Sequence, residues 1–139
     1  MKTRSAVPIV IILVFSLLFL GVVTGTFNLS FGFGNLTVKE IVKNNPNADI
    51  LLLDGIVFSN VTNADWVKEN EYEKSQKIGI IKKQTTNTWW FRNFYAFKLP
   101  KGTKLFSVNG QTYEEGDAPY IILVELHDEL LVYQALVEG

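Results

Sequence analysis

The 139-residue sequence contains no cysteine and a single histidine, His127. Without cysteine the chain can form neither disulfides nor thiolate-based zinc and iron–sulfur sites, and it has no thiol nucleophile. His127 follows Leu126 and precedes Asp128 in a polar turn, where an exposed surface role is expected. The sequence also lacks a Gly-x-Ser-x-Gly motif, a phosphate-binding loop and a dinucleotide-binding fingerprint. We therefore expect a protein that is not an enzyme and that uses no cofactor or metal.

The chain also has little net charge, because 13 basic side chains stand against 14 acidic ones. A nucleic-acid-binding domain carries a strong basic excess, so nucleic acid is not an expected partner. The charges are unevenly ordered: Lys74 to Lys104 contains eight bases and no acid, and Glu114 to Glu138 contains seven acids and no base. Either the two segments face each other across neighbouring strands, or the basic one contacts lipid headgroups or an anionic envelope polymer.

What the sequence does contain is a long apolar segment near its beginning. Residues 6–25 carry no charge over 20 residues, which is about the length that a membrane-spanning helix needs. Lys2 and Arg4 precede this segment, and the next charged residue is Lys39, so the positive-inside rule puts residues 1–5 in the cytoplasm. We predict a signal-anchor helix over 6–25 and a single-pass cell-membrane protein with an extracytoplasmic body.

The alternative is a protein secreted after signal cleavage. The best cleavage positions follow Gly25 and Thr26, and neither offers an Ala-x-Ala pattern, so we favour the uncleaved anchor. An exported domain without cysteine is typical of a bacterial envelope protein.

Residues 26–36 form an uncharged linker that is rich in glycine and contains Phe27, Phe31 and Phe33. Aromatic side chains favour the headgroup region of a bilayer, so this tether is expected to touch the membrane surface. The remaining residues, 37–139, are numerous enough to fold as one globular domain without disulfides.

The globular domain begins with a capped helix. Thr37 and Glu40 have the spacing of a capping box, in which the Thr hydroxyl and the Glu carboxylate each bind a free backbone amide. The helix is predicted over 38–44 and ends before Pro46, because the residue before proline is disfavoured in the helical region.

Most of the domain is predicted to be β-structure. The apolar run Ile50–Phe58 reads as one central strand covered on both faces, with Asp54-Gly55 marking a bulge. Further strands are expected at 77–84, 94–99, 104–108, 120–126 and 130–136, with tight turns between several of them. The predicted fold class is therefore α+β: a mainly antiparallel sheet or small open barrel with one or two short helices.

Carboxylates offer the remaining route to catalysis. Asp49 and Asp54 flank part of an apolar run, where they either stabilise the fold or serve as functional buried acids. Glu114, Glu115 and Asp117 lie in a polar loop, and solvation is their expected role. A carboxylate-based hydrolase of envelope glycan is accordingly a minor alternative.

The candidate binding segment lies within the basic stretch. It combines Trp89, Trp90, Arg92, Tyr95 and Lys98 with Thr and Asn residues, a composition suited to stacking, hydrogen bonding and anion contact. Core packing is the competing interpretation. Neighbouring residues of a strand point to opposite faces, so we expect one tryptophan in the core and the other exposed.

Together these observations predict a membrane-anchored extracytoplasmic binding or interaction domain. Its expected partners are the lipid bilayer and either an anionic envelope polymer or a protein; the sequence does not predict an oligomeric state. An inhibitor or immunity-type protein that blocks a partner with its aromatic loop is the main alternative.

Overall fold

A computed structural model describes residues 36–137. The predicted anchor over 6–25 and nearly all of the linker lie outside the described residues. Within 36–137, none of the helices has both the length and the apolar character needed to cross a bilayer.

The described residues form a small β-rich domain with two short α-helices. In chain order the elements are α2 (Val38–Asn44), β1 (Ile50–Leu53), β2 (Ile56–Asn60), α3 (Asp65–Lys68), β3 (Lys74–Ile80), β4 (Lys83–Gln84), the 3-10 turn η1 (Thr88–Trp90), β5 (Tyr95–Ala96), β6 (Lys104–Val108), β7 (Ile121–Leu126) and β8 (Glu129–Ala135).

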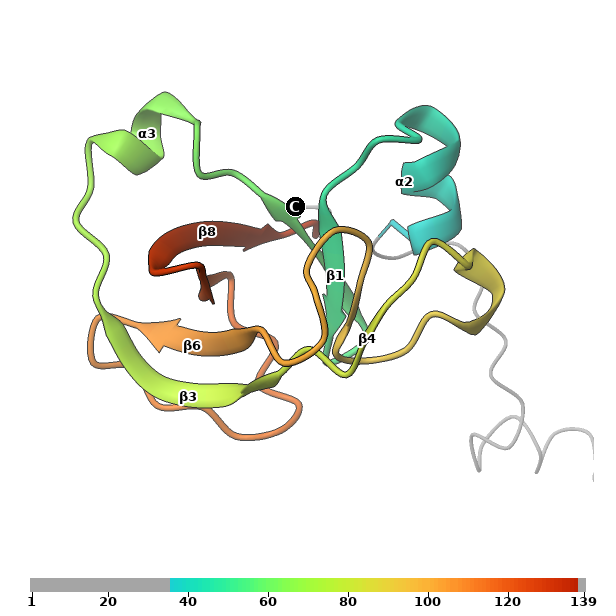
Figure 1. Ribbon diagram of the computed structural model, residues 1–139. Helices are drawn as coiled ribbons and strands as arrows, with labels where there is room; N and C mark the ends of the chain where they lie inside the picture. The colour runs from blue at the N-terminus through green and yellow to red at the C-terminus, as the bar shows by residue number, and fades with distance from the viewer. Residues whose placement is uncertain (1–35, 138–139) are drawn as a thin grey trace, which may run out of the picture. The chain divides into compact units, whose positions relative to one another are not determined.

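The eight strands form one sheet in the order β3-β6-β7-β8-β2-β1-β5-β4. All neighbours are antiparallel except β4 and β5, which run parallel. The sheet curls into an open half-barrel (Figure 1). The expectation of a mainly antiparallel, β-rich domain with short helices is confirmed.

Both edges of this sheet are irregular or short. At one edge, β3 pairs with β6 through two register shifts, one between Lys74 and Lys77 and one between Lys77 and Gly79. At the other edge, β4 has two residues, Lys83 and Gln84.

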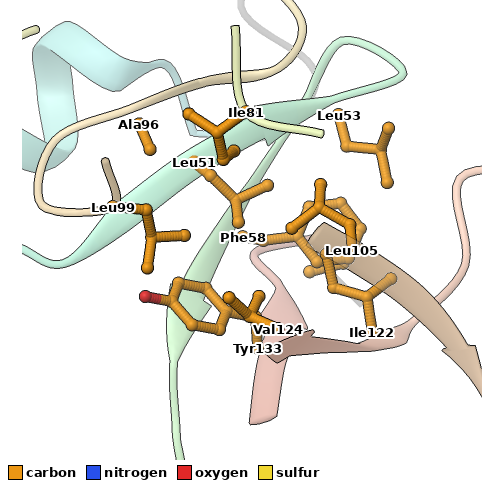
Figure 2. Packing of buried hydrophobic residues seen from close by; sticks show 11 residues of the cluster. Leu51, Leu53, Phe58, Ile81, Ala96, Leu99, Leu105, Ile122, Val124 and Tyr133 are labelled. Carbon is orange, nitrogen blue, oxygen red and sulfur yellow. The ribbon is translucent and has the colours of Figure 1, made fainter. Parts of the chain in front are cut away.

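The enclosed face of the sheet holds the main core. Side chains from strands across the whole sheet meet there, around the fully buried Phe58 (Figure 2). The buried members of this cluster are Leu51, Leu53, Phe58, Ile81, Ala96, Leu99, Leu105, Ile122, Val124, Tyr133 and Ala135.

The outer face is covered by the two helices at separate places. α2 lies over β1 and β2, where Val38 packs with Ile50 and Val57. α3 lies over the other half of the sheet, where Val67 packs with Leu123 and Val132. In Figure 1 the two helices accordingly stand on opposite sides of the domain. β1 is thus covered on both faces, as its apolar run predicted.

The single strand predicted over Ile50–Phe58 is wrong, because this segment forms the hairpin of β1 and β2. Asp54 and Gly55 make a two-residue turn with φ angles of 52° and 75°. Two positive φ angles define the hairpin turn that Asp-Gly favours, and glycine adopts such an angle without a steric penalty. The apolar run continues on both sides of the turn, which concealed the reversal of the chain.

The start of the domain follows the capping-box prediction. The Thr37 hydroxyl accepts a hydrogen bond from the backbone N–H of Glu40, and the Glu40 carboxylate accepts one from the backbone N–H of Thr37. These bonds hold the pKa of Glu40 below its ordinary value, so its carboxylate stays charged and turned toward the cap.

Opposite charges do meet across strands, in one place. Lys74 on β3 forms an ion pair with Glu125 on β7, reaching across β6, and the pKa of Glu125 is lowered mainly by this hydrogen bond. Lys104 stands opposite Glu125 in the register of β6 and β7. Over 36–137 ion pairing is confined to Lys74 and Glu125, so cross-strand pairing accounts for a small part of the basic segment.

The domain should fold without the predicted anchor. The fragment 36–139 keeps the three buried clusters that the structure describes within 36–137. We expect this fragment to be soluble and to unfold in one cooperative thermal transition, as small domains do. Circular dichroism checks this, and an aggregated fragment or one without a transition would contradict it.

Candidate functional site

The most exposed large apolar side chains in residues 36–137 are those of Trp89 and Trp90, which are 79% and 68% exposed. Both lie on η1, so the expectation that one of them belongs to the core is wrong. The alternation of faces holds for a strand, whereas this segment forms a 3-10 turn. Asn87 caps the turn, because its side-chain oxygen accepts a hydrogen bond from the backbone N–H of Trp89 at 3.0 Å.

The third aromatic residue in the row, Phe91, attaches this turn to the domain. Its ring packs edge-on against Phe97 at 5.2 Å and against Tyr95 at 6.1 Å between ring centroids. Phe91 also packs on the cluster between α2 and β1, whereas both tryptophans are exposed. One aromatic ring therefore holds the turn in place and the other two remain free to contact a ligand.

The base of the loop that carries η1 is fixed by backbone hydrogen bonds. The N–H of Thr85 donates to the carbonyl of Ala96 at 2.9 Å, and the N–H of Phe94 donates to the carbonyl of Leu52 at 2.7 Å. The carbonyl of Phe94 accepts from the N–H of Lys82 at 2.8 Å. Both ends of the loop are thereby joined to the sheet, which positions the tryptophans relative to the domain.

Phe94 closes this base in an unusual conformation. Its φ is 66°, in the left-handed region that a bulky residue rarely adopts. Its ring lies against Gly79 of β3, where a Cβ atom would come within 2.7 Å of Phe94 Cε1. Gly79 thus leaves room for the ring, and Lys82 Nζ lies 5.0 Å from the ring centroid. Gly79 and Phe94 therefore pack together at the base of the loop that carries η1.

A lysine from another element lies over one of the tryptophan rings. Lys39 of α2 places its Nζ 4.5 Å from the centroid of the Trp89 ring. α2 and η1 therefore lie side by side, as Figure 1 also shows. We call Trp89, Trp90, Lys39 and Arg92 the tryptophan surface.

Comparison with known proteins gives no family for this chain. No protein-family model, curated protein or solved structure matches it. The candidate site is therefore defined by the residues of the tryptophan surface alone.

The other residues predicted for the site have different positions. Arg92 is exposed and follows η1 by two residues, so the chain connects it to the tryptophans without a direct contact to either ring. Tyr95 is half-buried in β5 and serves mainly as a packing partner of Phe91. Lys98 is exposed after β5 and has no contact that joins it to the tryptophans.

The two candidate acids are engaged in hydrogen bonds of the fold. Asp49 accepts from the Tyr133 hydroxyl at 2.7 Å and from the Asn60 amide at 2.8 Å. Asp54 accepts from the Tyr113 hydroxyl at 2.7 Å and from two backbone N–H groups, of Gly116 and Ala118, at 3.0 Å each. Over 36–137 no group of three potential metal-ligating side chains occurs.

The tryptophans should contribute little to stability. In the fragment 36–139, Trp90→Ala should change the free energy of unfolding by less than about 0.5 kcal/mol, as surface substitutions do. Trp89→Ala should cost about 0.5–1 kcal/mol because it also removes the contact with Lys39. Phe91→Ala is the control and should cost about 2 kcal/mol or more. Urea unfolding measures all three, and a large loss for both tryptophan variants would show that the pair is structural.

Proposed function

We propose that this chain is a membrane-anchored, extracytoplasmic binding domain, without enzymatic activity, that contacts its ligand through the tryptophan surface. The observation that carries the proposal is the exposure of two adjacent tryptophans, 79% and 68%, on a turn whose base is fixed to the sheet. The predicted signal-anchor helix over 6–25 supplies the location.

Exposed tryptophans support binding because they are costly to leave in water. An indole ring offers a large apolar area with few rotatable bonds, and tryptophan and arginine dominate the energetics of known interfaces. Here Trp89, Trp90 and Arg92 occur within four residues, and all three are exposed. Exposed side chains can contribute little to stability and still contribute strongly to ligand binding.

The positions of the acids support a non-enzymatic role. A glycan hydrolase needs two carboxyl groups flanking the bond that is cleaved. Asp49 and Asp54 instead have their oxygens occupied by hydrogen bonds from side chains and backbone amides of the fold. These hydrogen bonds indicate that both residues stabilise the fold.

Photo-crosslinking in native membranes tests the proposal with the full chain. A benzophenone amino acid placed at position 90 should form a reproducible adduct with an envelope component. The same amino acid at Trp66 is the matched control, because Trp66 is also partly exposed but lies on α3. No adduct at position 90, or the same adduct from both positions, would contradict a binding role of the tryptophan surface.

A further inference from the structure

We propose that the ligand of the tryptophan surface is the headgroup layer of an anionic lipid bilayer, the same membrane that the chain is predicted to span. This inference rests on the proposed function and names the ligand class of that site. In this arrangement the domain is docked on the extracytoplasmic surface of that membrane instead of moving freely at the end of its linker.

The chain enters the domain beside the tryptophan surface. The linker ends at Leu36, and α2 begins at Val38. Lys39, in the first turn of α2, lies 4.5 Å from the centroid of the Trp89 ring. The tryptophan surface is therefore next to the point of attachment and not at a distant part of the domain.

The linker between the predicted anchor and the domain has a short reach. Residues 26–36 span at most roughly 36–40 Å when fully extended, from about 3.3–3.6 Å per residue. A domain of this size has a radius of gyration of about 13 Å, so an anchored domain stays within about one diameter of the bilayer. At such a high effective concentration, a contact that would be weak in solution suffices for docking.

The side chains of the tryptophan surface have the chemistry of residues that contact anionic bilayers. Tryptophan is enriched at membrane–water interfaces because its ring is apolar and its N–H is polar. Lys39 places positive charge over the Trp89 ring, and the exposed Arg92 follows Trp90 by two residues in the sequence. Basic side chains attract anionic headgroups. The single acid of α2, Glu40, is turned to the Thr37 cap, and Lys74 to Lys104 contains no acid.

The shape of the surface also favours a lipid layer over a sugar or peptide. Binding sites for small ligands are concave and bury most of the ligand. Trp89 and Trp90 are more than two-thirds exposed, so little protein surrounds either ring. Two exposed rings, one of them beneath a lysine, suit insertion into a headgroup layer, as does the aromatic linker that precedes α2.

Fluorescence quenching by lipid tests this inference directly, because the only tryptophans in the chain are 66, 89 and 90. The full chain is reconstituted into vesicles of phosphatidylcholine and phosphatidylglycerol that contain brominated lipid. In the Trp66→Phe variant, the tryptophan fluorescence comes only from Trp89 and Trp90. In the double variant Trp89→Phe/Trp90→Phe, it comes only from Trp66. These exposed aromatic replacements preserve the core, and circular dichroism verifies the fold of each variant.

We expect brominated lipid to quench Trp66→Phe strongly and the double variant weakly. Replacing Lys39 or Arg92 by Gln should lower the ratio of docked to undocked domain about fivefold for each charge removed. Lys68→Gln on α3 is the control and should leave quenching unchanged. Vesicles of phosphatidylcholine alone should give weaker quenching than the anionic mixture.

Two results would overturn the inference. Equal quenching of both tryptophan reporters would mean that the domain has no preferred face toward the lipid, and no quenching of either would mean that it does not dock. If quenching fails while position 90 still crosslinks to a polymer or protein, the lipid is the wrong ligand and the binding function stands. If both experiments fail, the binding function fails as well.

Discussion

Tyr133→Ala should lower the free energy of unfolding of the fragment 36–139 by about 3–5 kcal/mol, the usual cost of removing a large core aromatic. Tyr133 is fully buried and packs in the main core with Phe58 and Leu99. In Figure 2 its hydroxyl is the one red atom and points away from Val124. That hydroxyl donates a hydrogen bond to the Asp49 carboxylate at 2.7 Å. The Tyr133 ring thus packs in the core while its hydroxyl is paired with a charged group.

The same residue should make the domain sensitive to alkali. Burial raises the pKa of Tyr133 well above its ordinary value, and the neighbouring charge of Asp49 raises it further. In the unfolded chain the hydroxyl ionises near pH 10. Stability from this group is therefore complete below about pH 10 and falls above it by about 1.4 kcal/mol per pH unit.

Tyr133→Phe isolates this effect. At pH 7 it should cost about 2 kcal/mol through the lost hydrogen bond to a carboxylate, and it should flatten the decline of stability above pH 10. The pKa of Tyr113 is also raised, first by desolvation and then by Asp54, but Tyr113 is more exposed, so Tyr113→Phe should flatten the decline less. Urea unfolding between pH 7 and 11 measures both variants; an unchanged slope for Tyr133→Phe would refute the assignment.

Asp54→Ala should cost about 2–3 kcal/mol of stability. Asp54 accepts three hydrogen bonds from the loop that joins β6 and β7, and bonds to a charged group contribute more than neutral ones. Its φ of 52° is also one that aspartate tolerates better than alanine does.

Asp54→Asn is the matched control, because asparagine tolerates the same backbone angle and keeps one acceptor. It should cost less than half as much as Asp54→Ala. Amide hydrogen exchange at Gly116 and Ala118 gives a local measurement, and both amides should exchange faster in the alanine variant. An alanine variant as stable as the parent would show that the loop does not depend on Asp54.

The elements that sequence predicted well are those with local signals. The helix over Val38–Asn44 has its cap and its stop within ten residues, and β6 is bounded by a glycine turn on one side and by Asn109-Gly110 on the other. The hairpin of β1 and β2 was missed because both strands are covered on both faces. Without an alternation of polar and apolar residues, nothing but Asp54-Gly55 marked the reversal.

The candidate site was predictable in composition but not in arrangement. Trp89, Trp90 and Arg92 stood out because aromatic and cationic residues occur together without acids. The packing of Phe91, in place of either tryptophan, against the domain depends on Phe97 and on α2, which the local sequence does not contain. Lys39 lies 50 residues before Trp89, and no local pattern could bring it over that ring.

The two ends of the sheet bear on how copies of this protein behave near one another. A free strand edge can pair with the edge of another molecule, and natural sheets prevent this with bulges, lysines and very short strands. β3 has both register shifts and lysines, and β4 offers two residues for pairing. A membrane anchor, as proposed for residues 6–25, would confine molecules to two dimensions and make their encounters frequent. A sheet with such edges can be crowded on that surface without joining its neighbours strand to strand.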